Sequence, residues 1–168
     1  TGNDTASTYG MNTNSKNNVT IANCTIRGYS IGILLNLGQN ATVSNNTING
    51  SRSISSNGIY CNQCTGSNIS SNTVYAFTSN GIPMSNGPND LRIFNNTIYV
   101  DGTTVGIGGA SGGTPTRASW VYNNTIIGTT NLTTSGSPIY GLPRWQIYDN
   151  NVSIQTTSGP GTALSMGG

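Results

Sequence analysis

The feature that most constrains this chain is a short pattern that recurs along its 168 residues. Six segments carry it: IANCTI, VSNNTI, ISSNTV, IFNNTI, VYNNTI and IYDNNV. Successive copies are 22, 26, 24, 28 and 26 residues apart, and one aligned column holds Cys24, Asn46, Asn72, Asn96, Asn124 and Asn150. A period of this length is typical of repeat proteins, in which each turn of the chain stacks on the next.

Two columns on either side of this position contain only β-branched residues. The column three residues before it holds Ile21, Val43, Ile69, Ile93, Val121 and Ile147. The column two residues after it holds Ile26, Ile48, Val74, Ile98, Ile126 and Val152. Because β-branched residues favour extended backbone, each unit is expected to bury one aliphatic side chain on both sides of a short turn. Such regular spacing argues against disorder, which the polar composition would otherwise suggest.

A third strand is expected in most units, marked by glycine before an aliphatic residue, as in GILL, GIYC, GIPM and GIGG. Its inward column would be Ile33, Ile59, Ile82, Ile107, Ile139 and Leu164. Three short strands per coil of roughly 25 residues predict an all-β parallel solenoid of about six coils, forming a single domain over residues 1–168. At a strand spacing of about 4.8 Å, six coils give a rod on the order of 30 Å long.

An asparagine repeated at one bend can hydrogen-bond the asparagine of the coils above and below it. We therefore predict an amide ladder at one turn, formed by Asn46, Asn72, Asn96, Asn124 and Asn150. The ladder would stop at Cys24, or a small apolar side chain would replace the amide there. The alternative is that each asparagine only favours its own local bend.

The pattern I/V-x-x-N-x-I/V followed by G-I extends over residues 19–166. It resembles the right-handed parallel β-helix repeat of the pectate-lyase-like superfamily, including the NosD-like repeats. The resemblance implies a right-handed, three-sheet solenoid that is usually extracellular or periplasmic and often acts on, or is attached to, polysaccharide. It does not imply one function, because this scaffold hosts lyases, hydrolases, phage tailspikes, adhesins and structural proteins.

Charge and composition exclude several classes of function. Only 6% of residues are charged, the net charge is +2, and no basic run exists, so a nucleic-acid partner is not expected. No apolar segment is long enough to span a membrane. The chain has no His and no Glu, and its carboxylates are Asp4, Asp90, Asp101 and Asp149, which occupy different positions of different coils. Paired acids for glycoside hydrolysis are therefore not expected, and no enzymatic activity is predicted.

The lyases and hydrolases of the resembling superfamily use acidic clusters or Asp pairs with His, and neither set can be placed on this sequence. No cofactor and no metal site are predicted, since CNQC at residues 61–64 is a single C-x-x-C without a second pair. Two alternatives stay open there: a local disulfide between Cys61 and Cys64, or buried thiols. The acids Asp90 and Asp149 share coils with Arg92 and Arg144, and surface pairing is expected.

Candidate glycosylation sites are numerous because the repeat itself creates Asn-x-Ser/Thr. Four of them share one column next to the predicted ladder and are expected to point outward, so glycans would form a row along one edge. With two further candidates, the set is Asn23, Asn45, Asn95, Asn123, Asn68 and Asn131.

The column next to the inward aliphatic holds Phe94, Tyr122 and Tyr148 on three successive coils. Alternation along a strand makes these rings outward, so they would form a stacked aromatic strip. The strip could contact sugar rings or a neighbouring subunit, and the alternative is that the rings only stabilise the sheet.

The first and last residues fall at equivalent phases of the repeat, with no evident caps. This predicts either a segment of a longer β-helix or a subunit that stacks end to end or side by side on its own copies. We expect a non-catalytic extracellular or cell-surface solenoid, structural or adhesive, that forms or decorates a filament, sheath or stalk. The alternative is a polysaccharide-binding or polysaccharide-cleaving module of the pectate-lyase type. Ice binding by a Thr face is weaker, because the Thr column beside the ladder is single.

Overall fold

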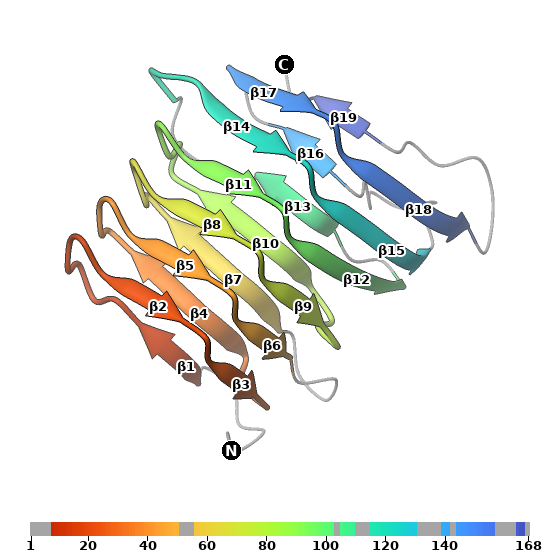
Figure 1. Cartoon of the computed structure of the whole chain (residues 1–168), viewed down its shortest axis with the longest axis horizontal. Coiled ribbons are helices and arrows are strands. Elements are labelled where there is room, and N and C mark those ends of the chain that lie inside the picture. The colour runs from red at the N-terminus through yellow and green to blue at the C-terminus, as the bar shows by residue number, and fades with distance from the viewer. Residues whose placement is uncertain are drawn as a thin grey trace.

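The computed structural model describes residues 8–50, 56–102, 105–109, 115–130, 139–141, 144–156 and 164–166. These residues form a solenoid of three parallel β-sheets, which we name A, B and C. Equivalent strands of successive coils lie side by side, and the chain progresses steadily from β1 at one end to β19 at the other (Figure 1). Sheet A has seven strands in the described residues and sheets B and C have six each, which confirms the predicted fold class of about six coils.

Each coil runs through sheet B, then sheet C, then sheet A. Sheet A contains β1 (Tyr9–Asn12), β4 (Ile31–Asn36), β7 (Asn57–Asn62), β10 (Asn80–Ser85), β13 (Val105–Gly109), β16 (Ile139–Gly141) and β19 (Leu164–Met166). Sheet B contains β2 (Thr20–Ala22), β5 (Thr42–Ser44), β8 (Asn68–Ser70), β11 (Arg92–Phe94), β14 (Ser119–Tyr122) and β17 (Trp145–Tyr148). Sheet C contains β3 (Thr25–Arg27), β6 (Thr47–Asn49), β9 (Thr73–Tyr75), β12 (Thr97–Gly102), β15 (Thr125–Thr130) and β18 (Asn151–Thr156).

The three aliphatic columns that the sequence predicts, one from each sheet, form most of the core, and further buried residues such as Leu35, Met84 and Leu91 complete it. In sheet B, for example, Ile93 pairs in register with Ile69 on one side and with Val121 on the other. In sheet A, Ile59 and Ile82 are completely buried. Like residues therefore meet like residues along the rod axis, and each coil buries its aliphatic side chains against the next.

A column of glycines lets sheets A and C approach each other closely. The column follows the register of sheet A and comprises Gly10, Gly32, Gly58, Gly81 and Gly106. A Cβ atom on Gly58 would collide with Cγ1 of Val74 in sheet C and with the carbonyl oxygen of Gly81 in the next coil. The glycine that marks β1, β4, β7 and β10 in the sequence is thus required by packing.

In the part of the chain that the structure describes, no helix is long and apolar enough to cross a bilayer.

Candidate functional site

The turn from sheet B to sheet C carries the asparagine ladder. Oδ1 of Asn72 accepts hydrogen bonds from the backbone N–H and the side-chain amide of Asn46, both at 3.0 Å. Nδ2 of Asn72 donates to Oδ1 of Asn96 and to the carbonyl oxygen of Val43, also at 3.0 Å. Asn96 and Asn124 repeat the arrangement. The predicted ladder is confirmed, and each amide satisfies backbone groups of a buried turn that would otherwise lack partners.

The ladder ends at Cys24, where the sequence replaces asparagine. Oδ1 of Asn46 accepts the backbone N–H of Cys24 at 3.0 Å, so the last amide still satisfies that donor. The Cys24 thiol donates to the carbonyl oxygen of Ala22 at 3.2 Å. Cys24 has no side-chain amide, so the line of amide–amide hydrogen bonds ends at Asn46. At the other end, Nδ2 of Asn150 donates to the carbonyl oxygen of Val121 at 2.9 Å.

The residue before each ladder position has a left-handed backbone and an exposed side chain. Its φ angle is 55° at Asn45, 56° at Ser71 and 55° at Asn95. Asparagine tolerates this conformation better than most residues, which explains the first Asn of each Asn-Asn pair. The second Asn makes the ladder, and a β-branched Thr begins the next strand. Backbone geometry therefore accounts for the recurring Asn-Asn-Thr segment without glycosylation.

The candidate glycosylation sites within the described residues fall in two kinds of environment. The exposed left-handed position is occupied by Asn23, Asn45, Asn95 and Asn123. Asn68 lies on the outer face of β8, is partly buried, and its Oδ1 is sealed from solvent without a hydrogen-bond partner. Asn131 lies outside the described residues. Glycosylation itself stays a prediction.

Sheet B carries a stack of three aromatic rings on its outer face. The ring centroids of Phe94 and Tyr122 are 5.1 Å apart with planes 3° apart, and the same values hold between Tyr122 and Tyr148. The three residues pair in register across β11, β14 and β17. Because the rings face one another, both faces of Tyr122 are occupied, and the stack presents ring edges and the two tyrosine hydroxyls outward.

A second row lies beside the stack, two residues earlier on the same three strands. It consists of Arg92, Trp120 and Gln146, which also pair in register. The Cζ of Arg92 lies 5.3 Å from the ring centroid of Trp120, a cation–π contact. The indole Nε1–H of Trp120 donates to Oε1 of Gln146 at 2.9 Å. We call the six side chains of the two rows the aromatic platform.

Sequence reasoning identified only one row of the platform. The signal for the other was present, because alternation along a strand places Trp120 on the same face as Tyr122. The positions equivalent to the platform on the first three coils carry small or uncharged side chains: Thr20, Ala22, Thr42, Ser44, Asn68 and Ser70. The outer face of sheet B therefore carries small or uncharged side chains as far as β8, and the larger side chains of the aromatic platform from β11 onward.

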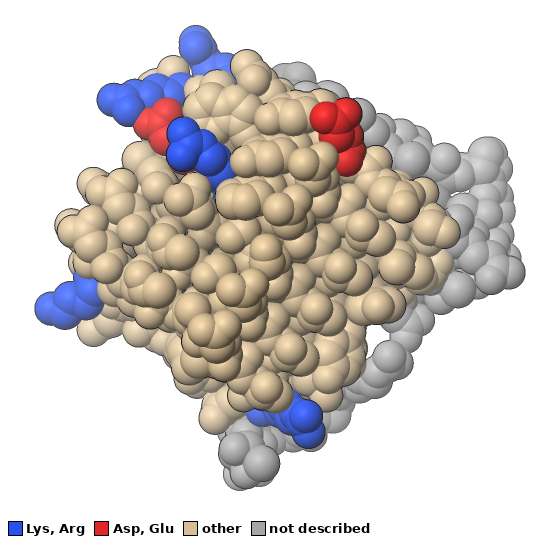
Figure 2. Space-filling view, in the orientation of Figure 1, with Lys and Arg blue, Asp and Glu red and all other residues tan. Residues whose placement is uncertain are grey.

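Charged side chains gather beside the platform. Figure 2 shows several Lys, Arg and Asp side chains near the end of sheet B that carries β14 and β17, other cations at the left edge and the bottom, and a mostly uncharged surface between them. The expected pairing of Asp90 with Arg92 is wrong: Asp90 forms an ion pair with Arg117 of the next coil, at the turn that precedes β14. Arg92 lies over Trp120 instead. Asp90 lies in the turn before β11 with a left-handed backbone (φ 54°), so the alternation of a strand does not place its side chain beside that of Arg92.

Cys61 and Cys64 are joined as a disulfide in this structure, and both side chains are buried. Of the two alternatives for the C-x-x-C segment, the structure thus has the disulfide, which closes the turn after β7. Cys24 is the free cysteine of the described residues.

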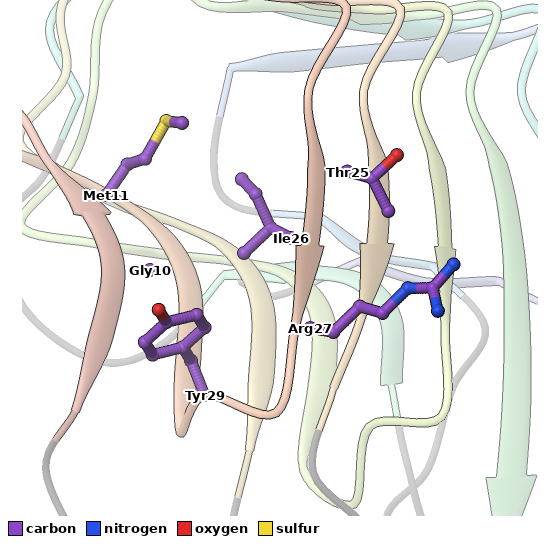
Figure 3. A pocket seen from close by; sticks show the side chains of 6 residues that line it. All are labelled: Gly10, Met11, Thr25, Ile26, Arg27 and Tyr29. Carbon is purple, nitrogen blue, oxygen red and sulfur yellow. The ribbon is translucent and has the colours of Figure 1, made fainter. Parts of the chain in front are cut away.

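A pocket of about 240 Å³ opens between β1 and β3. Met11, Ile26 and Tyr29 point into it, whereas Thr25 and Arg27 lie on the other side of β3 (Figure 3). Ligand sites usually combine apolar walls with a few convergent polar groups. The side chains that point into this pocket belong to the core or pack against it, and they do not supply a convergent set of polar groups. The platform is therefore the stronger candidate site.

The row of threonines in sheet C is single, as the sequence indicates. Thr25, Thr47, Thr73, Thr97 and Thr125 pair in register. The next outward row on the same sheet holds Arg27, Asn49, Tyr75 and Tyr99, which interrupts a flat hydroxyl surface.

Comparison with known proteins identifies one family. Residues 1–162 match the family described as "Periplasmic copper-binding protein (NosD)". No curated protein and no solved structure matches the chain. The description of the family as periplasmic agrees with the predicted extracellular or cell-surface location.

The copper named in that description has no fitting donor set among the residues described here. Copper sites use imidazole, thiolate and thioether ligands, and this chain has no His. Cys61 and Cys64 are consumed by the disulfide, and Met84 is completely buried in the core. The described residues contain no group of three or more His, Cys, Asp or Glu side chains that could hold a metal ion.

Proposed function

The chain belongs to the NosD family, and from that premise we propose that it is a non-catalytic extracellular β-solenoid with a structural or adhesive role. In this proposal it forms or decorates a surface filament, sheath or stalk and makes its contacts through the aromatic platform. The observation that carries the proposal is the preorganised platform itself, whose side chains are fixed by ring stacking, a cation–π contact and a hydrogen bond. Rigid aromatic side chains are enriched at protein interfaces because little entropy is lost when they bind.

The carboxylate inventory supports a non-catalytic role. Hydrolysis of glycosides requires two acids on either side of the scissile bond. The described Asp90 is held in an ion pair with Arg117, and Asp149 occupies a left-handed turn position beside Tyr148. The chain offers no His or Glu as a further acid or base.

The disulfide and the hydrogen-bonded ladder of the solenoid support a role outside the cytoplasm. A disulfide persists in oxidising compartments, and the one between Cys61 and Cys64 closes a surface turn. In the described residues, hydrogen bonds of the ladder and the sheets join successive coils, and only 6% of the residues of the chain are charged.

Self-association through the platform can be tested by analytical ultracentrifugation and negative-stain imaging over a range of concentrations. We expect oligomers or filaments in the wild type, and weaker assembly when Tyr122→Ser and Tyr148→Ser are combined. Tyr99→Ser is the matched control, because Tyr99 is an exposed tyrosine on sheet C, away from the platform. A wild type that stays monomeric at high concentration would contradict assembly as its role.

A second candidate function is polysaccharide binding, and the platform favours it for a separate reason. Aromatic rings beside amide, hydroxyl and guanidinium groups suit a ligand that combines apolar C–H faces with hydroxyls. The test is binding to a panel of neutral and acidic polysaccharides, with the Tyr99→Ser control. Absence of binding and of cleavage across the panel would remove this candidate.

A further inference from the structure

The ring stack on sheet B ends abruptly at Phe94, and this end leaves one ring face without an aromatic neighbour. Tyr122 occupies the face of Phe94 directed toward β14. The opposite face is directed toward β8, where the residue in register is Ser70, followed by Ser44 on β5. Phe94 and both serines are partly exposed. The next ring position of the stack is thus filled by a small side chain.

The surroundings of this open face are polar and uncharged. Asn68 and Thr42 form the neighbouring outward positions on β8 and β5. Thr42 contributes a hydroxyl group, which both donates and accepts hydrogen bonds, and Asn68 contributes an uncharged amide. Oδ1 of Asn68 is sealed from solvent without a hydrogen-bond partner, so it is not an acceptor that a ligand on this face can reach.

The nearby charges are directed elsewhere. The guanidinium of Arg92, which pairs in register with Asn68, lies over Trp120 on the far side from β8. Arg117 is engaged by Asp90. A ligand at the open face of Phe94 would therefore meet an aromatic wall and a hydroxyl and amide floor, with no free charge directed toward it from these groups.

We propose that this position, which we call the ring slot and define by Phe94, Ser70, Ser44 and Asn68, binds one pyranose unit of a neutral polysaccharide. The proposal rests on the second candidate function and specifies its ligand. The C–H face of the sugar stacks on the open face of Phe94, in the place that a fourth ring would take. Its hydroxyls bond to the hydroxyls of the two serines. An acidic sugar is disfavoured, because no unpaired cation lies in the slot.

The decisive variant is Ser70→Tyr, which fills the slot by adding a ring in register with Phe94. Stacked cross-strand aromatic pairs stabilise sheets, so this variant should fold and melt at or above the wild-type temperature. The matched control is Asn49→Tyr, because Asn49 stands in register with Tyr75 on sheet C as Ser70 stands with Phe94 on sheet B. A second variant, Phe94→Ala, removes the wall of the slot.

The probes are neutral oligosaccharides of glucose, mannose, xylose and N-acetylglucosamine, with oligogalacturonate as the acidic comparison, measured by titration calorimetry. We expect the wild type to bind at least one neutral probe more tightly than oligogalacturonate. Ser70→Tyr should weaken that binding by about tenfold or more, and Phe94→Ala by about threefold to tenfold, as expected for loss of one stacking contact. Asn49→Tyr should bind like the wild type.

The outcomes separate this proposal from the function on which it rests. If a neutral oligosaccharide still binds Ser70→Tyr but no longer binds Tyr148→Ser, the ring slot is wrong. That result would still support polysaccharide binding elsewhere on the platform. Preference for oligogalacturonate would also overturn the slot while sparing polysaccharide binding. If no probe binds the wild type, both proposals fail.

Discussion

Adjacent asparagines have different roles in each turn from sheet B to sheet C. Asn95 is exposed and has a left-handed backbone, whereas Asn96 is buried and its amide joins three coils. One residue satisfies a conformational requirement and the next a hydrogen-bonding requirement. The sequence alone predicted the second role but could not separate it from the first, because both favour the same residue type.

At the scale of single residues, Asn96→Ala should destabilise the chain strongly. It removes the acceptor of the Asn72 backbone N–H and the donor to the carbonyl oxygen of Ile69, which leaves buried polar groups unpaired. Each of these two unpaired groups costs about 1–3 kcal/mol, so we expect a loss of about 2–6 kcal/mol in the free energy of unfolding. Urea denaturation followed by circular dichroism measures it.

The control for that experiment is Asn95→Gly, since glycine adopts a positive φ without steric cost. Its free energy of unfolding should stay within about 1 kcal/mol of the wild type. Equal losses in the two variants would show that the amides of the ladder contribute no more than the turn geometry.

The disulfide gives a second prediction at this scale. Cys61 and Cys64 close a short loop, for which the chain-entropy relation gives a stabilisation of about 2 kcal/mol. Reduction of the wild type should therefore lower the melting temperature, and the Cys61→Ala/Cys64→Ala variant should melt at the same temperature with and without reductant. A melting temperature of the wild type that is insensitive to full reduction would contradict this contribution.

At the scale of strands, the sequence predicted which residues face the core but not how closely the sheets approach. The β-branched columns identified the inward faces, because burial requires the same residue class in every coil. The glycine before the inward aliphatic residue of β4, β7 and β10 was visible in the sequence only as a marker of the strand. Its cause, the side chain of a sheet C residue such as Val74 lying where a Cβ would be, depends on three-dimensional packing.

The strand-scale prediction follows from that packing. Gly81→Ala would place a methyl group against Cγ2 of Ile98 and the carbonyl oxygen of Gly106. Overpacking of this kind costs about 1–3 kcal/mol, which thermal or urea unfolding resolves. Ser44→Thr is the control, because it adds a methyl group to the outer face of sheet B, and it should change stability by less than about 0.5 kcal/mol. A neutral Gly81→Ala would indicate that sheets A and C are farther apart than described.

Contacts that depend on three-dimensional packing could not be predicted from the sequence at the candidate site either. The stacked row of Phe94 and its two tyrosine neighbours followed from alternation and the repeat. The pairing of Asp90 with Arg117 did not, because these residues are 27 positions apart and their alignment depends on the length of the intervening loops. Contacts between coils can be predicted only where the repeat fixes the register.

At the scale of the whole molecule, the chain is held together with few ionisable groups. It has no His and only four acidic residues, so almost nothing titrates between about pH 5.5 and pH 7.5. Stability depends on pH only where the folded and unfolded states bind different numbers of protons. The free energy of unfolding should therefore vary by less than about 1 kcal/mol over this range, measured by urea titrations at several pH values. A steeper slope would reveal a coupled titrating group.

The central claim is that coils stack in register, so that equivalent residues of successive coils touch. A crystal structure at a resolution that shows side-chain amides tests it most directly. The account predicts a continuous line of density through Asn46, Asn72, Asn96 and Asn124, with amide nitrogen to oxygen distances near 3.0 Å between successive coils. An antiparallel sandwich, or a solenoid whose asparagines point to solvent without touching, would contradict it.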